Sequence, residues 1–233
     1  MRARAPYMEW AKSRPRPDVD LAGSNLLACT LDDLPGARDA VDIAGESPNG
    51  YPPLVDAIAG HVGVDPSRVS IGIGCSGANF LALAALIDSG DEVLIEWPGY
   101  DPLVAAARML GAQVRFFERR FEEKWAVDPD RIAAALTPRT KCIVLSSPHN
   151  PSGVLASPAA MERLADLAQR KGFAVLVDEV YLDTVAGPVL PTAARFSSAC
   201  IATNSLTKSY GLTALRCGWS VASPETAEAI RRA

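Results

Sequence analysis

Histidine is scarce in this sequence, and its cysteines form no pattern. The 233 residues include only two histidines, His61 and His149, which excludes a metal site built from several histidines. The five cysteines stand singly, without the spacings of a zinc site or a disulfide framework. Several lie within apolar runs, which indicates free, buried thiols in a reducing cytoplasm. We therefore expect a cytoplasmic protein that holds no metal ion.

Long apolar runs and a strong charge imbalance are also absent. No run approaches the roughly 20 apolar residues of a membrane span. The basic start, Met-Arg-Ala-Arg-Ala-Pro, is not followed by the apolar segment of a signal peptide. A net charge of -4 gives no reason to expect a nucleic acid or a membrane surface as partner. The 48% of hydrophobic and 21% of charged residues are typical of a soluble globular protein with a substantial core.

Regular periodicity begins near residue 51. Residues 1–50 are rich in proline, glycine and aspartate, and only a short helix is predicted there, over 5–13. Beyond them, short apolar strands alternate with helices. We predict strands over 69–73, 92–96, 114–117, 142–145, 173–177 and 199–203, and helices that begin near 54, 78, 102, 129, 158 and 224. The alternation predicts an α/β fold with a mainly parallel sheet sandwiched by helices, with 1–50 as an N-terminal arm and 51–233 as one large domain.

Polar, glycine-rich or aromatic residues follow five of the predicted strands. The carboxyl ends of parallel strands meet at one edge of a sheet, where ligands collect. One such group is ordinary loop chemistry, but five together predict a binding site. The five groups are residues 74–79, 97–100, 146–153, 178–181 and 204–208.

Lys208 lies among hydroxyls and apolar residues in Ser205-Leu-Thr-Lys-Ser-Tyr-Gly211. Burying an ammonium group is costly unless its pKa falls, and an amine with a lowered pKa can attack an aldehyde to form a Schiff base. Ser205 and Arg216 supply hydrogen-bond donors for a single phosphate. The stretch therefore indicates pyridoxal 5'-phosphate, an aldehyde cofactor with one phosphate. The alternative is a solvated loop with an ordinary surface lysine.

Four further residues suit the same cofactor. Asp178 ends an apolar strand, and its carboxylate would pair with a protonated pyridine nitrogen, which makes the ring an electron sink. Tyr181 and Asn150 would donate to a phenolate oxygen, and Tyr100 would stack on a flat ring. Each has a plain structural alternative: a helix-capping aspartate, a turn asparagine or a core tyrosine.

Three motifs resemble, in order and spacing, the aminotransferase class I/II family of fold-type-I enzymes that use pyridoxal phosphate. They are Ser147-Pro-His-Asn-Pro-Ser-Gly153, Val177-Asp-Glu-Val-Tyr181, and Ser205-Leu-Thr-Lys-Ser-Tyr-Gly211 with Leu215-Arg-Cys-Gly218. Weaker agreement extends from about Gly50 to the end of the sequence.

The resemblance implies a role for each candidate residue. Lys208 would form the Schiff base and later move a proton, while Asp178 would hold the pyridine nitrogen. The remaining contacts would come from Asn150 and Tyr181 at the phenolate oxygen, Tyr100 at the ring face, and Ser205, Arg216 and the turn amides of Gly77 and Ala78 at the phosphate. It also implies an amino acid and a 2-oxo acid as substrates, and a homodimer with active sites at the interface.

Three features depart from the family pattern. Ala214 stands at a position where the family often has a glycine. Gly45 stands near the position where many members have a tyrosine that contacts the phosphate bound by the partner subunit, so we do not expect that contact. The sequence ends at Ala233, within the helix predicted from Pro224 and before the family's small domain, which carries the arginine that binds the substrate carboxylate. We expect a C-terminally incomplete chain that binds the cofactor weakly and turns over poorly.

Several functions share these residues. We predict an aminotransferase, but a C–S lyase or a ring-forming synthase would use the same cofactor residues. A non-catalytic domain that kept the fold is a third interpretation, against which the intact Lys208, Asp178 and Arg216 argue. A nucleotide-binding Rossmann domain is a fourth, because Gly72-Ile-Gly-Cys-Ser-Gly77 matches G-x-G-x-x-G, although this interpretation leaves Lys208 unexplained.

Overall fold

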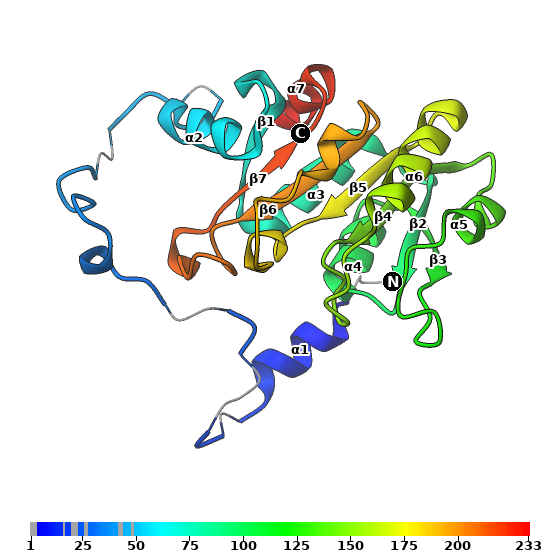
Figure 1. The fold of residues 1–233 in the computed structure, drawn as a ribbon, viewed down its shortest axis with the longest axis horizontal. Coiled ribbons are helices and arrows are strands. Elements are labelled where there is room, and N and C mark those ends of the chain that lie inside the picture. Colours follow the sequence, from blue (N-terminus) through cyan, green and yellow to red (C-terminus); the bar gives the residue numbers. More distant parts are fainter. Residues whose placement is uncertain (1–3, 16, 20–22, 26–27, 42–43, 48) are drawn as a thin grey trace.

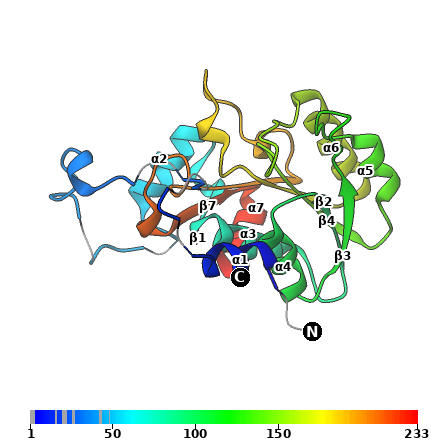
Figure 2. The same cartoon turned by 90° about the horizontal axis from the view of Figure 1, so that it is seen from below.

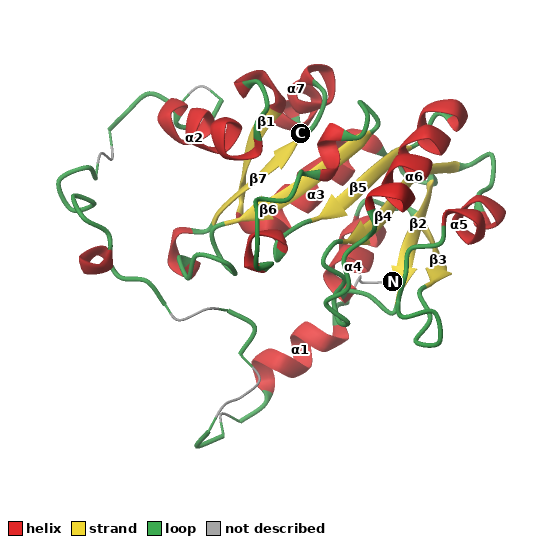
Figure 3. Cartoon of the chain, in the orientation of Figure 1, coloured by secondary structure: helices red, strands yellow, loops and turns green. Residues whose placement is uncertain are grey.

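One mixed sheet organises the protein. The computed structural model describes residues 4–15, 17–19, 23–25, 28–41, 44–47 and 49–233. Within these residues, a seven-stranded sheet has the order β1-β7-β6-β5-β4-β2-β3 (Figures 1 and 3). Its strands are β1 Val69–Ile73, β2 Glu92–Trp97, β3 Gln113–Glu118, β4 Thr140–Ser146, β5 Ala174–Asp178, β6 Cys200–Ser205 and β7 Cys217–Val221. The helices are α1 Pro6–Ser13, α2 Pro52–Val62, α3 Gly74–Leu86, α4 Asp101–Met109, α5 Pro129–Ala135, α6 Pro158–Lys171 and α7 Pro224–Arg232.

The sheet is mainly parallel, as predicted. The pairs β2–β3, β2–β4, β4–β5 and β5–β6 are parallel, whereas β7 runs antiparallel to both β1 and β6. The strand β7 was not predicted from the sequence. Gly218 weakens its strand pattern, and its pairing with β1, far earlier in the chain, leaves no local periodicity to detect.

Helices cover both faces of the sheet, which divides the core in two. Figure 2 shows α2, α5 and α6 on one side and α3, α4 and α7 on the other. Successive residues of β4 point to opposite faces of the sheet. Ile143 packs in the core that contains Leu164 of α6, and Val144 packs in the core that contains Leu83 of α3. Because both faces of the central strands are buried, their sequences read as continuous apolar runs.

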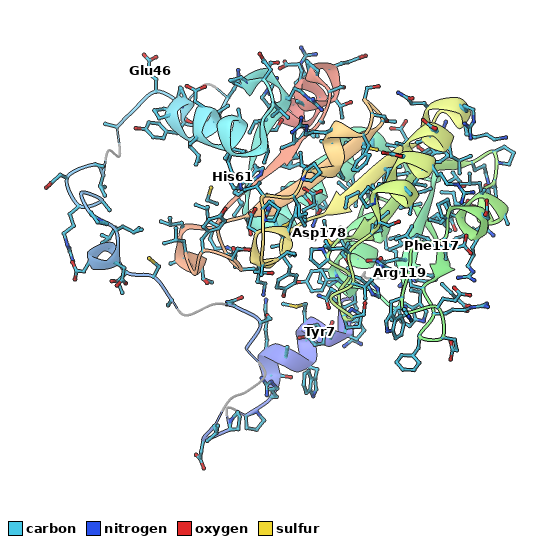
Figure 4. The ribbon with its side chains drawn as sticks, in the orientation of Figure 1. Tyr7, Glu46, His61, Phe117, Arg119 and Asp178 are labelled. Atoms are coloured by element: carbon cyan, nitrogen blue, oxygen red, sulfur yellow. The ribbon has the colours of Figure 1, made fainter. Side chains whose placement is uncertain are left out.

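A fully buried ion pair joins Glu96, in β2, to Arg119, directly after β3. Arg119 Nη1 donates to Glu96 Oε2 at 3.0 Å, and neither side chain has exposed surface. The backbone amide of Ser146 donates to Glu96 Oε1 at 2.7 Å, and the Ser146 hydroxyl accepts from the Asn150 amide at 3.0 Å. Figure 4 shows Arg119 beside Phe117, on the β3 side of Asp178. The pair thus ties the β2, β3 and β4 ends together.

His149 joins this cluster as a neutral ring. Its Nε2 lies 2.8 Å from the carbonyl oxygen of Pro98, which can only accept, so Nε2 carries the proton. Nδ1 then accepts from the Ser152 hydroxyl at 2.7 Å. Burial lowers the pKa of His149 to about 4, which keeps the ring uncharged at neutral pH. His149 therefore links the loop that carries Asn150 to the loop that carries Tyr100.

Two glycines allow α3 to approach the sheet closely. Gly72 and Gly218 are register partners in the β1–β7 pair. A Cβ atom at Gly218 would lie 2.2 Å from the carbonyl carbon of Gly74, and one at Gly72 would lie 2.9 Å from the amide nitrogen of Ala78. Both obstacles are backbone, so they cannot move aside as a flexible side chain would. The backbone at the beginning of α3 therefore packs directly against Gly72 and Gly218.

Replacing Gly218 by alanine should therefore destabilise the protein, because the added methyl group meets the backbone of α3. We expect the Gly218→Ala variant to lose about 3 kcal/mol of unfolding free energy, an overpacking effect. The matched control is Gly60→Ala in α2, where a Cβ atom would meet nothing within 4 Å. The control should gain about 0.5–1 kcal/mol. Urea unfolding measures both, and equal stabilities of the two variants would contradict the close approach.

His149 should make stability depend on pH. Between pH 6.5 and about 4 the unfolded chain binds a proton on this histidine and the folded protein does not, because burial lowers the pKa of His149 to about 4. The contribution of the neutral His149 ring to the unfolding free energy is complete above pH 6.5 and is lost as the pH falls towards 4. Glu96, whose pKa burial raises to about 7, acts in the opposite direction. As the pH falls from 6.5 towards 4, the difference in unfolding free energy between the wild type and His149→Asn should shrink by up to about 1.4 kcal/mol per pH unit. A difference that does not change with pH would contradict the assignment.

Candidate active site

The predicted polar groups meet at the carboxyl edge of the sheet. Asp178 is the last residue of β5 and Ser205 the last of β6, and α3 begins directly after β1. The charge of Asp178 acts on Lys208, Tyr100 and Tyr181, so these four residues share one site. In Figure 4, Asp178 lies near the middle of the molecule, consistent with the central place of β5 in the sheet.

Lys208 is half-buried and has a lowered pKa. Desolvation lowers the pKa, the nearby charge of Arg216 lowers it further, and Asp178 opposes both. Its Nζ lies 5.8 Å from the centre of the Tyr181 ring, a cation–π distance, and donates to the Ser24 hydroxyl at 2.7 Å. An amine with a lowered pKa and an aromatic neighbour suits the nucleophilic chemistry predicted from the sequence.

Asp178 is buried and accepts from three donors. The Val180 amide donates to Oδ1 at 3.0 Å, the Cys75 thiol lies 3.4 Å from Oδ1, and the Asn79 amide donates to Oδ2 at 2.8 Å. Burial raises the pKa of Asp178, and these donors and Lys208 counteract the rise. Both oxygens of the buried carboxylate thus accept hydrogen bonds, and the bond from the Val180 amide is of the capping type, whereas those from α3 are not.

The start of α3 differs from the prediction. The helix was predicted from Ala78, and it begins at Gly74. Gly77 and Ala78 therefore lie inside the helix, and the positions whose amides have no place in the helical hydrogen-bond pattern are those of the first turn. Gly74 uses its amide to donate to the Arg216 carbonyl at 2.7 Å. Cys75 and Ser76 are left to offer amides to an anion.

Arg216 lies over this helix start. A Cβ atom at Gly74 would approach Arg216 Nη2 to 2.5 Å, so a side chain there would displace the guanidinium group, and the φ of 69° at this position also favours glycine. Arg216 itself has a left-handed backbone conformation, with φ of 47°, which is uncommon outside glycine and recurs at functional sites. Ser205 is the register partner of Gly218, next to the same turn. Thr207 adds a buried hydroxyl that has no hydrogen-bond partner among the described residues.

Tyr100 and Asn150 complete the set of predicted residues. Burial raises the pKa of Tyr100 to about 12, and its hydroxyl donates to Met8 Sδ at 3.5 Å. Asn150 follows β4, whose last residue, Ser146, is the register partner of Asp178. Asn150 therefore lies in a loop beside Asp178, positioned through its backbone amide.

Sequence reasoning missed two features of the site. Ser24, in the segment treated as an arm, accepts from Lys208 and forms a hydrogen bond with Tyr181. The amide of Cys29, in the same segment, donates to the Gly211 carbonyl at 3.2 Å. Asn79 lies in the group 74–79 that was predicted to reach the site, but it was given no role there, and it donates to Asp178 Oδ2 at 2.8 Å. No local pattern marked Ser24.

Neither a metal-binding cluster nor a helix able to cross a membrane is present in the described part of the chain. It contains no group of three or more histidine, cysteine, aspartate or glutamate side chains placed to hold a metal ion. Its helices include none that combines the length and the apolar character needed to cross a bilayer.

Comparisons with known proteins agree with the motifs. The family model for aminotransferase class I and II matches residues 28–233. The aromatic amino acid aminotransferase of Mycolicibacterium vanbaalenii is 30% identical over 210 residues, which cover 85% of this chain and 58% of that protein. Capreomycidine synthase of Streptomyces vinaceus is 34% identical over 167 residues, which cover 71% of this chain and 43% of that protein. The chain spans about half the length of the curated relatives it matches.

Solved structures similar to this chain are also aminotransferases. A PLP-dependent aminotransferase from Streptococcus suis matches with a TM-score of 0.87 and 28% identity, covering 100% of this chain and 66% of that one. Aspartate aminotransferase from Thermus thermophilus with maleate matches with a TM-score of 0.75 and 29% identity, covering 80% of this chain and 50% of that one. Together with the family model, these matches show that the chain belongs to the aminotransferase class I and II family.

Proposed function

We propose that this chain is the pyridoxal-phosphate-binding part of an aminotransferase that moves an amino group from an amino acid to a 2-oxo acid. The observation that carries the proposal is the pairing of Lys208, an amine with a lowered pKa, with Asp178, a buried carboxylate, within electrostatic reach at one edge of the sheet. The names of relatives such as the aromatic amino acid aminotransferase support it.

The residues at this edge fit the cofactor. Thr207 has a buried hydroxyl without a partner among the described residues, and its backbone amide donates to the Ser205 hydroxyl at 3.3 Å. The Arg216 guanidinium group lies over the start of α3. Hydroxyls, a guanidinium group and helix-start amides together are donors for a phosphate. We therefore propose that Ser205, Thr207, Arg216 and the amides of Cys75 and Ser76 hold the phosphate, in place of the amides of Gly77 and Ala78.

Each of the other predicted residues has a proposed task. When bound, pyridoxal phosphate supplies an aldehyde and a ring that accepts electrons. Lys208 would supply the amine that binds this aldehyde and would move a proton at the substrate carbon, roles that its lowered pKa favours. Asp178 would pair with the protonated ring nitrogen. Tyr181 and Asn150 donate to the phenolate oxygen, and Tyr100 stacks on the ring.

A second candidate function keeps the cofactor and changes the reaction. The similarity to capreomycidine synthase, at 34% identity, favours retaining a synthase or a lyase as the alternative. We also propose a homodimer, on the family resemblance, and a cytoplasmic location, because the cysteines are free thiols and three of them are buried.

Removing the Lys208 amine should abolish the covalent link to the cofactor. With pyridoxal phosphate, the wild type should become yellow, and borohydride reduction should attach the cofactor to the peptide that contains Lys208. The Lys208→Ala variant should show neither, while its far-ultraviolet circular dichroism stays unchanged, because a half-buried lysine adds little to the core. The matched control is Lys171→Ala, an exposed lysine at the end of α6. Labelling that persists in Lys208→Ala would refute the Schiff-base assignment.

Amino-group transfer separates the two candidate functions. We expect an amino donor to yield its 2-oxo acid beyond one equivalent only when an acceptor 2-oxo acid is present. Lys208→Ala should lower this rate by about 10²–10⁴-fold, the usual contribution of a positioned acid or base. Chromatography of the products, with pyruvate and 2-oxoglutarate as acceptors, measures the transfer. Turnover without an acceptor, with release of ammonia, would favour the lyase instead.

A further inference from the structure

Three side chains outside the predicted set converge on Asp178. They are Cys75, Asn79 and Thr203, which we call the carboxylate clamp. Asn79 Nδ2 donates to Asp178 Oδ2 at 2.8 Å, and Thr203 Oγ1 donates to Asn79 Oδ1 at 2.6 Å. The Cys75 thiol lies 3.4 Å from Asp178 Oδ1. All four side chains are buried, so water does not compete for these bonds.

The fold itself brings the clamp together. Cys75 and Asn79 are four residues apart on α3, so they lie on one face of the helix. Asp178 and Thr203 are register partners in the parallel β5–β6 pair, so their side chains lie next to each other on one face of the sheet. That face is covered by α3, since Leu176 and Ile201 of these strands share a core with Leu83 of α3.

Thr203 determines which end of the Asn79 amide faces Asp178. A carboxylate can only accept hydrogen bonds, so it needs the NH₂ group of Asn79 and not its oxygen. The Thr203 hydroxyl has a proton to donate and takes the amide oxygen. Without that hydroxyl, the amide loses the bond that fixes its orientation. The hydrogen bonds of the clamp therefore run in one direction: Thr203 donates to Asn79, and Asn79 donates to Asp178.

The clamp also acts on the charge of Asp178. Burial raises the pKa of this carboxyl group, and the hydrogen bonds from the Val180 amide, Asn79 and Cys75 lower it. Burial likewise raises the pKa of the Cys75 thiol, as does the charge of Asp178, so Cys75 keeps its proton and donates. The other titratable groups that act on Asp178 or feel its charge are Lys208, Tyr100, Tyr181 and Glu179. Among them only Lys208 is a cation that favours the charged form.

We propose that Asn79, oriented by Thr203, is a positioning residue that holds Asp178 in its charged form for the ring nitrogen of the cofactor. The inference rests on the proposed function and names a residue that acts through Asp178 without touching the ring. The Cys75 thiol has a lesser part, because a thiol is a weak donor.

Two conservative changes at Thr203 separate positioning from packing. Thr203→Val has the same shape and no hydroxyl, whereas Thr203→Ser keeps the hydroxyl. Asn79→Leu removes the donor to Asp178. In the protein without cofactor, the Asp178 carboxyl resonance, followed by ¹³C NMR, should titrate at a higher pH in Asn79→Leu and Thr203→Val than in the wild type, and Thr203→Ser should match the wild type.

The bound cofactor provides a second measurement. Loss of a hydrogen bond to a charged group should weaken pyridoxal phosphate binding by about 10–100-fold in Asn79→Leu. Thr203→Val should weaken binding less, and Cys75→Ala least. The pH midpoint of the visible absorbance change should rise in Asn79→Leu and Thr203→Val, because a ring that loses its positive charge makes the linkage to Lys208 more basic.

The outcomes distinguish this inference from the function on which it rests. If the wild type binds no pyridoxal phosphate, both are overturned. If the wild type binds it, and neither the Asp178 titration nor the absorbance midpoint moves in Asn79→Leu and Thr203→Val, the positioning role alone is overturned. Loss of stability without either shift would identify the clamp as packing, and would also overturn the inference.

Discussion

A buried carboxylate and a half-buried amine that stabilise each other's charge form the constraint on which the rest of the site depends. Desolvation alone would neutralise both, since it raises the pKa of Asp178 and lowers that of Lys208. Each opposes the effect of burial on the other. The protein also needs donors on the far side of the carboxylate, and Asn79 and the Val180 amide provide them. The end of β5, one face of α3 and the loops that carry Val180 and Lys208 must therefore hold fixed positions relative to one another.

On the side of the site that we propose holds the phosphate, close backbone contacts set the geometry. Gly72 and Gly218 let α3 approach two neighbouring strands, and Gly74 leaves room for the Arg216 guanidinium group. Arg216 reaches that position from a left-handed backbone conformation, while its carbonyl accepts from the Gly74 amide. Positions with so little free space tolerate few side chains, which explains why glycines recur in the motifs on both sides of the lysine.

The sequence predicted the layers of the fold and the residues that end its strands, because both follow from local periodicity. Asp178 and Lys208 were found in this way, since polar residues after buried strands stand out. The predicted start of α3 was wrong, because Gly74 and Gly77 resemble a turn. The strand β7 was missed because Gly218 interrupts its apolar pattern and one of its partners, β1, lies far earlier in the sequence. Ser24 and Asn79 contact the site across 184 and 99 residues, and no local pattern encodes such contacts.

The place of β7 in the sheet has a consequence for how the protein is made. Among the described residues, β1 is an edge strand whose neighbour in the sheet is β7, far later in the sequence. During synthesis from the N-terminus, β1 therefore has no strand to pair with until β7 emerges. Gly74 and Arg216, which form the two halves of the turn proposed to hold the phosphate, meet only after β2 to β6 have been made. Long-range pairings of this kind slow folding, and this one delays assembly of that turn until all seven described strands are present.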